Sequence, residues 1–110
     1  MNVLFVCSQN KLRSVTAERL FSSCEGIEVA SAGLDRDATK ILTPELADWA
    51  DLIFVMEKTH RNKLHKLMGS RFNATRVICL DIPDEYELMD EDLIEILKHR
   101  TSLYLPATAR

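Results

Sequence analysis

Glycine, proline and cysteine are scarce in this sequence, with three of each in 110 residues. So little glycine and proline argues against a disordered or low-complexity chain. Three cysteines, an odd number, do not suit a disulfide framework and suggest reduced thiols in a cytoplasmic protein. No apolar run approaches the roughly 20 residues of a membrane span, and neither end carries a recognisable leader or lipidation motif. We therefore expect a cytoplasmic protein without a membrane partner.

An excess of charge of one sign is also missing. Lysine and arginine number 14 against 17 aspartates and glutamates, which gives a formal net charge of −3 at pH 7. Such a chain has no strong general attraction for nucleic acid, so no nucleic-acid partner is expected. The hydrophobic share of 46% and charged share of 28% are ordinary for a globular protein. We expect one domain spanning residues 1–110.

Short apolar runs alternate with amphipathic stretches along the whole chain. The runs are typical of buried strands and the stretches have helical spacing. The expected strands are 3–7, 27–32, 52–56 and 76–80, and the expected helices are 14–24, 44–50, 59–68 and 90–103. This order predicts an α/β fold of three layers, in which a four-stranded parallel sheet has helices on both faces. Ligands of such sheets bind beyond the carboxyl ends of the strands.

The segment Cys7-Ser8-Gln9-Asn10-Lys11-Leu12-Arg13-Ser14 joins the first strand to the first helix. Backbone N–H groups of such a loop can converge on an anion, and the positive helix N-terminus adds to that attraction. The guanidinium of Arg13 can grip two phosphate oxygens, and a thiol in such a field favours its thiolate form. The segment thus predicts a nucleophile beneath a phosphate cradle.

The spacing Cys-x5-Arg is weak evidence by itself. Cys7 could be a small buried strand residue, and Arg13 a solvated helix residue. Their position at the first strand-to-helix junction favours the phosphate-binding interpretation. Neither Gly-x4-Gly-Lys-Ser/Thr nor Gly-x-Gly-x-x-Gly occurs, so nucleotide-binding loops of those kinds are not indicated. The three histidines lack the spacing of a metal site, and we assign no metal.

Four segments resemble the low-molecular-weight protein tyrosine phosphatase family, in the family's order and over nearly the whole chain. They are Cys7-x5-Arg13-Ser14, Ser31-Ala32-Gly33, Ala-Asp-Leu-Ile-Phe-Val-Met-Glu at 50–57, and Ile-Pro-Asp-Glu-Tyr at 82–86. The resemblance implies a phosphotyrosine phosphatase I-like fold. It also implies hydrolysis of phosphomonoesters, with protein phosphotyrosine as the expected substrate, through a cysteinyl-phosphate and without metal or organic cofactor.

The resemblance also implies roles for single residues. Cys7 would attack phosphorus, Arg13 would bind the phosphoryl oxygens, and Asp84 would be the general acid. Asn10, with a positive φ, would hold the loop shape, and Ser14 would hydrogen-bond the Cys7 sulfur. Further residues would bind the substrate or a phosphate or sulfate anion, namely Ser8, Gln9, Lys11, Leu12 and, as a wall of the substrate slot, Tyr86. The partner would be a phosphorylated protein or a small phosphomonoester.

Several departures from the family pattern leave alternatives open. Gln9 and Glu85 replace the family's usual Gly and Pro, and Asp81 competes with Asp84 for the acid role. Lys11 at the pocket mouth would attract an acidic substrate neighbourhood, or would simply face solvent. The chain is also shorter than typical members after Gly33. The rival functions are a non-catalytic phosphate-binding or regulatory module, a IIB-like phosphocarrier domain and an arsenate reductase.

Overall fold

Four parallel strands form a single sheet at the centre of the computed structural model, which describes residues 1–106. The strands are β1 (Asn2–Cys7), β2 (Glu28–Gly33), β3 (Leu52–Val55) and β4 (Val77–Cys79), in the spatial order β2-β1-β3-β4. β1 pairs on one side with β2, where Cys7 lies opposite Gly33, and on the other side with β3. The strand that carries Cys7 is therefore an inner strand, held along both edges.

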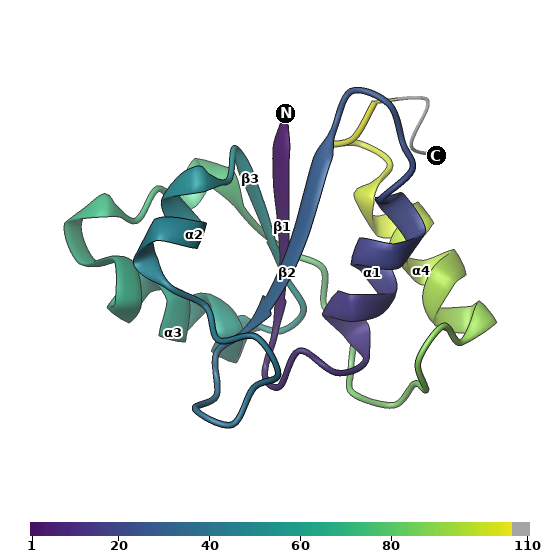
Figure 1. Ribbon diagram of the computed structural model, residues 1–110, viewed down its shortest axis with the longest axis horizontal. Coiled ribbons are helices and arrows are strands. Elements are labelled where there is room, and N and C mark those ends of the chain that lie inside the picture. The colour runs from purple at the N-terminus through teal and green to yellow at the C-terminus, as the bar shows by residue number, and fades with distance from the viewer. Residues whose placement is uncertain (107–110) are drawn as a thin grey trace.

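Helices cover both faces of this sheet (Figure 1). α1 (Arg13–Phe21) and α4 (Glu91–Thr101) lie on one face, and α2 (Pro44–Trp49) and α3 (Lys58–Met68) lie on the other. Two short 3₁₀ turns, Gly69–Arg71 and Ala74–Arg76, lead from α3 into β4. The expected three-layer α/β architecture with a four-stranded parallel sheet is confirmed.

The core has two halves because side chains of β1 alternate between the two faces. Val3, Phe5 and Cys7 pack with α1 and α4, whereas Leu4 and Val6 pack with α2 and α3. Phe5 is fully buried, and its ring stacks at 5.7 Å from that of Phe21 and 5.2 Å from that of Phe54. Packing of this kind anchors β1 up to the residue that begins the candidate site.

The sequence offers four markers of helix ends, Thr43, Pro44, Gly69 and Ser14, and the structure confirms all of them except Ser14. Thr43 caps α2, with Pro44 in its first turn, and Gly69 ends α3 with a φ of 58°. Ser14, the expected N-cap of the first helix, is not the cap, because α1 already begins at Arg13. The Ser14 hydroxyl contacts the Cys7 sulfur instead of a backbone N–H group. A tertiary partner therefore takes the place of the local capping bond.

Several element ends also differ from the sequence-based bounds. β4 covers only Val77–Cys79, α1 ends at Phe21 and α4 ends at Thr101, so each is shorter than expected. Such ends are where local periodicity carries least information, since they depend on hydrogen-bond partners elsewhere in the chain. No helix within residues 1–106 is long and apolar enough to cross a bilayer.

Candidate active site

A pocket of about 300 Å³ opens where β1 ends and α1 begins. Its lining brings together most of the residues that the sequence singled out, namely Cys7, Ser8, Gln9, Lys11, Leu12, Arg13 and Asp84. Residues 7–13, which we call the Cys7–Arg13 loop, supply all of them except Asp84. Asp84 comes from the segment after β4, so two strand carboxyl ends contribute to one site, as expected for a parallel sheet.

The Cys7 thiol lies at the base of this pocket with only 3% of the residue exposed. Its Sγ atom lies 3.0 Å from the Ser14 hydroxyl, and the backbone N–H of Asn10 donates to it over 3.3 Å. Two donors can therefore converge on the sulfur. Both are placed to stabilise negative charge that develops on this sulfur.

Asn10 supports the contact between Cys7 and Ser14 and is itself buried, with 4% of the residue exposed. Its φ of 54° matches the positive value expected from the sequence, which Asn tolerates better than most residues. The side-chain amide donates to the hydroxyls of Ser14 at 2.8 Å and Ser31 at 2.9 Å. Ser31 in turn donates to the Glu18 carboxylate at 2.6 Å. Because a lone pair of the Ser14 hydroxyl accepts from Asn10, its own proton is free to point at Cys7.

Arg13 is buried to 3% exposure and is held by three oxygen groups. Its Nη1 donates to Glu57 Oε2 at 2.6 Å and to the Ile82 carbonyl at 2.8 Å, and its Nε lies 3.7 Å from Asp84 Oδ1. Nη1 is thus fully used, whereas Nη2 and Nε keep N–H groups for a ligand. Glu57 directly follows the third expected strand. The rule that ligands bind beyond the carboxyl ends of parallel strands therefore predicts that Glu57 lies near the site, but it does not predict the ion pair with Arg13.

The structure separates the two candidate acids after β4. Asp84 is exposed at the pocket rim beside Arg13, with 64% of its side chain accessible. Asp81, in contrast, does not line this pocket. Its backbone has a φ of 52°, and its carboxylate accepts from the Cys79 thiol at 3.4 Å. Burial raises the pKa of that Cys79 thiol, which keeps it protonated as a donor. Of these two acids, only Asp84 therefore faces the pocket.

His60 contacts the pocket lining through Ser8, and no short-range sequence pattern points to this contact. The residue is 1% exposed, and its Nε2 lies 2.9 Å from the hydroxyl of Ser8, while its Nδ1 accepts the backbone N–H of Glu57 at 3.1 Å. Burial and, secondarily, the nearby Arg13 charge lower the pKa of His60, and the Glu57 carboxylate opposes this shift in part. The ring is therefore neutral near pH 7.

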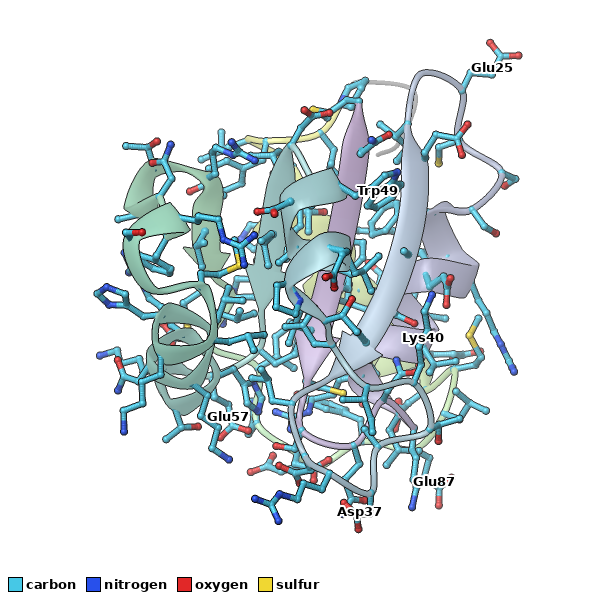
Figure 2. All side chains as sticks on the ribbon, turned by 60° about the vertical axis from the view of Figure 1, so that its left-hand side comes forward. Glu25, Asp37, Lys40, Trp49, Glu57 and Glu87 are labelled. Atoms are coloured by element: carbon cyan, nitrogen blue, oxygen red, sulfur yellow. The ribbon has the colours of Figure 1, made fainter. Side chains whose placement is uncertain are left out.

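The segment 34–42, between β2 and α2, supports the Cys7–Arg13 loop through its backbone. The N–H groups of Leu34, Asp35 and Thr39 donate to the carbonyls of Cys7, Ser8 and Gln9 at 3.0, 2.9 and 3.0 Å. Figure 2 shows Asp37 of this segment and Glu57 at the same end of the molecule, far from Glu25. The sequence predicted neither a strand nor a helix here, between the expected strand 27–32 and the expected helix 44–50.

The remaining predicted site residues, Tyr86, Lys11 and Leu12, differ in their position relative to the pocket. Tyr86 is half-buried against the core beside α1 and α4 and does not line the pocket, so its role as a slot wall stays a prediction. Lys11 and Leu12 lie at the exposed mouth. Within residues 1–106, no cluster of three or more His, Cys, Asp or Glu side chains is arranged to hold a metal ion.

Comparison with known proteins finds relatives by structure and not by sequence. The chain matches no protein-family model and no curated protein. Solved structures match it over nearly their whole length. SP-PTP of Streptococcus pyogenes, a low-molecular-weight protein tyrosine phosphatase, gives a TM-score of 0.78 at 15% identity over 96% of this chain and 94% of that one. The tyrosine phosphatase Wzb of Escherichia coli K30, in complex with phosphate, gives a TM-score of 0.76 at 19% sequence identity over 94% of both chains.

A third structure is a variant of YwlE arginine phosphatase, a protein of Bacillus subtilis, with a phosphorylated active-site serine. It gives a TM-score of 0.72 at 23% identity over 100% of both chains. The fold is that of the low-molecular-weight protein tyrosine phosphatases. The resemblance seen in four short segments is therefore confirmed at the level of the fold. In this phosphatase fold the Cys7–Arg13 loop follows the inner strand β1 directly.

Proposed function

We propose that this chain is a cysteine-dependent phosphatase that hydrolyses phosphomonoesters, with phosphotyrosine in proteins as the substrate class. The observation that carries the proposal is the convergence of Cys7, the buried Arg13 and the exposed Asp84 on one pocket. Similar solved structures, described as tyrosine and arginine phosphatases and including one with bound phosphate, support it. The partner is a phosphorylated protein or small phosphomonoester, and the setting is the cytoplasm.

In the first step, the Cys7 thiolate attacks phosphorus as the bond between phosphorus and the ester oxygen breaks. The free N–H groups of Arg13 and of the loop bind the non-bridging oxygens, whose charge is redistributed in the transition state. The Asp84 carboxyl donates its proton to the leaving oxygen, so that an alcohol or phenol departs rather than its anion. The products are the free alcohol and a cysteinyl-phosphate.

In the second step, water attacks the cysteinyl-phosphate and the sulfur–phosphorus bond breaks. The Asp84 carboxylate takes a proton from that water, which restores the carboxyl group for the next cycle. Cys7 leaves as a thiolate, and the hydrogen bonds from Ser14 at 3.0 Å and from the Asn10 N–H at 3.3 Å stabilise the charge on its sulfur. Inorganic phosphate is released.

A phosphocarrier or a regulatory phosphate-binding module is the second candidate. A IIB-like phosphocarrier retains its phosphoryl group on cysteine and needs neither an arginine in this loop nor a partner acid. Here Asp84 Oδ1 lies 3.7 Å from Arg13 Nε, at the rim of the same pocket as Cys7. An acid at this place has a use in hydrolysis and none in carriage, which favours the phosphatase. An arsenate reductase would need further cysteines placed to resolve an oxidised nucleophile, and Cys24 and Cys79 do not line the pocket.

Hydrolysis of para-nitrophenyl phosphate and phenyl phosphate by four proteins tests the proposal. Cys7→Ser should abolish turnover. Asp84→Asn should lower the rate by on the order of 10²–10⁴-fold with phenyl phosphate and less with para-nitrophenyl phosphate, whose phenolate leaves without help. Asp81→Asn is the matched control, because Asp81 lies outside the pocket lining, and it should retain activity.

The outcomes separate the candidates. Phosphate binding without any turnover between pH 5 and 8 would reject the phosphatase and favour the binding module. Stable phosphorylation of Cys7 in the unmodified protein, without release of phosphate, would favour the carrier. An equal loss in Asp81→Asn and Asp84→Asn would reject the assignment of the acid.

A further inference from the structure

The pair formed by Ser8 and His60 has no place in the two-step reaction described above. His60 Nε2 and Ser8 Oγ lie 2.9 Å apart, although the residues are 52 positions apart in the chain. Ser8 lines the pocket next to Cys7, and His60 lies behind it in the first turn of α3 with 1% exposure. A buried histidine on a hydroxyl at the pocket wall fixes that hydroxyl in one orientation.

The direction of this hydrogen bond follows from the other side of the ring. The backbone N–H of Glu57 donates to His60 Nδ1 at 3.1 Å, so Nδ1 must present its lone pair. In a neutral imidazole the single proton is then on Nε2. His60 consequently donates to Ser8, and the Ser8 oxygen accepts.

The two largest effects on the ring, burial and the charge of Arg13, both favour its neutral form. Burial and Arg13, from α1, lower the pKa of His60, and Lys63, one turn along α3, adds to this effect. Glu57 and Asp35 act in the opposite direction. Lys63 and Asp35 are themselves paired at 3.6 Å, so their effects on the ring partly cancel.

The Ser8 hydroxyl therefore keeps its own proton free for another acceptor. Among residues 1–106, His60 is the one hydrogen-bond partner of this hydroxyl, and it occupies the acceptor side. A phosphoryl group in the pocket has three non-bridging oxygens. Arg13 has only Nη2 and Nε to offer, because Nη1 is used by Glu57 and Ile82. A further donor on the Ser8 side of the pocket would complement the guanidinium.

We infer that the Ser8 hydroxyl is an additional hydrogen-bond donor to the bound phosphoryl group, and that His60 is the positioning residue that aims it. This inference rests on one part of the proposed function, namely that the ligand of the pocket is a phosphoryl group. It adds to the backbone N–H groups and Arg13 a side-chain donor whose orientation depends on α3. Phosphate affinity should therefore depend on the Ser8–His60 hydrogen bond.

Titration of the full chain with inorganic phosphate, followed by calorimetry, tests the pair without requiring turnover. Ser8→Ala should weaken phosphate binding roughly ten- to a hundredfold, as expected for a lost hydrogen bond to a charged group. His60→Asn keeps an acceptor near Nδ1 but ends short of Ser8. It should weaken binding roughly two- to tenfold, because the Ser8 hydroxyl must then be oriented on binding.

His60→Gln is the matched control for His60→Asn. Its amide N–H₂ reaches about as far as Nε2, and its carbonyl can still accept the Glu57 N–H, as Gln often does at this helix position. It should retain most of the phosphate affinity. The double variant Ser8→Ala/His60→Asn should bind no worse than Ser8→Ala, since His60 acts only through Ser8.

Urea unfolding of each variant separates loss of folding from loss of the hydroxyl. Wild-type phosphate affinity in Ser8→Ala would overturn the inference. Equal affinities in His60→Asn and His60→Gln would show that His60 only caps α3, and would overturn its positioning role. If the protein binds phosphate as expected here but turns over no ester, the proposed function fails and this inference stands. If ester turnover is normal but Ser8→Ala binds phosphate as tightly as the wild type, this inference fails and the proposed function stands.

Discussion

Replacement of Asn10 should impair Cys7 without altering any atom that touches the substrate. The Asn10 amide donates to Ser14 at 2.8 Å and to Ser31 at 2.9 Å, in a region where all three residues are buried. The bond to Ser14 occupies a lone pair of its hydroxyl and leaves the serine proton free to point at the sulfur. Asn10→Asp has nearly the same shape, but its carboxylate accepts where the amide donates. The Ser14 proton would then turn away from Cys7, and a negative charge would lie beside the thiolate.

The magnitudes follow from the contacts that are lost. Asn10→Ala removes two hydrogen bonds, each with a net effect of about 0.5–1.5 kcal/mol, and places alanine at a φ of 54°, which adds about 1–2 kcal/mol. We expect it to lower the free energy of unfolding by about 2–5 kcal/mol. Asn10→Gly avoids the backbone strain and should cost less. Asn10→Asp loses a hydrogen bond to a charged sulfur, so kcat should fall roughly ten- to a hundredfold.

Two measurements check this reasoning. Urea unfolding should give a lower free energy of unfolding for Asn10→Ala than for Asn10→Gly, because only alanine is strained at the positive φ. Rapid-mixing kinetics with para-nitrophenyl phosphate should show that Asn10→Asp slows both formation and hydrolysis of the cysteinyl-phosphate. A wild-type kcat in Asn10→Asp would refute the proposed direction of the Ser14 hydrogen bond. Equal stabilities of the Ala and Gly variants would refute the strain at this position.

Three further predictions concern the surroundings of the loop. Gly33→Ala would bring its Cβ within 2.7 Å of the Ser8 carbonyl and 2.9 Å of the Asn10 nitrogen, so stability should fall by about 1–3 kcal/mol and phosphate binding should weaken. Gly69→Ala, with nothing within 4 Å, is the control and should leave phosphate affinity unchanged. Because the pKa of His60 lies below its ordinary 6.5, the unfolded chain takes up a proton first as the pH falls. Below pH 6.5 the free energy of unfolding should therefore decrease by up to about 1.4 kcal/mol for each pH unit. If the free energy of unfolding of His60→Gln depends on pH as that of the wild type does, this prediction is contradicted. Lys11→Ala should lower kcat/KM most for acidic phosphopeptides, and a uniform loss on all phosphopeptides would show that Lys11 merely faces solvent.

The sequence predicts the architecture well because short apolar runs and amphipathic stretches respond to local physics. It also predicts that Cys7, Arg13 and Asp84 meet, because carboxyl ends of parallel strands share one edge of the sheet. The contribution of His60 could not be predicted in this way. A histidine in the first turn of a polar helix has no short-range pattern, and its partner Ser8 is 52 positions away.

Two other residues show the same limit in different ways. Ser14 has the composition signal of a helix cap, but its hydroxyl is used by Cys7 and Asn10, which no local rule anticipates. Glu57 lies in a segment that the resemblance includes, yet its ion pair with Arg13 at 2.6 Å depends on the distance between β1 and β3. The missing information is the three-dimensional neighbourhood of each polar side chain.

The three hydrogen bonds from segment 34–42 fix the direction of three peptide dipoles in the Cys7–Arg13 loop. All peptide bonds described are trans, and in a trans peptide the N–H points opposite to the carbonyl of the preceding residue. With the carbonyls of Cys7, Ser8 and Gln9 turned toward Leu34, Asp35 and Thr39, the next three N–H groups point away from that segment, and that of Asn10 meets the Cys7 sulfur. These dipoles carry no titratable proton, so their attraction for anions persists at any pH at which the chain is folded. Since the donors are backbone groups, the side chains of that segment can be changed while these dipoles keep their direction.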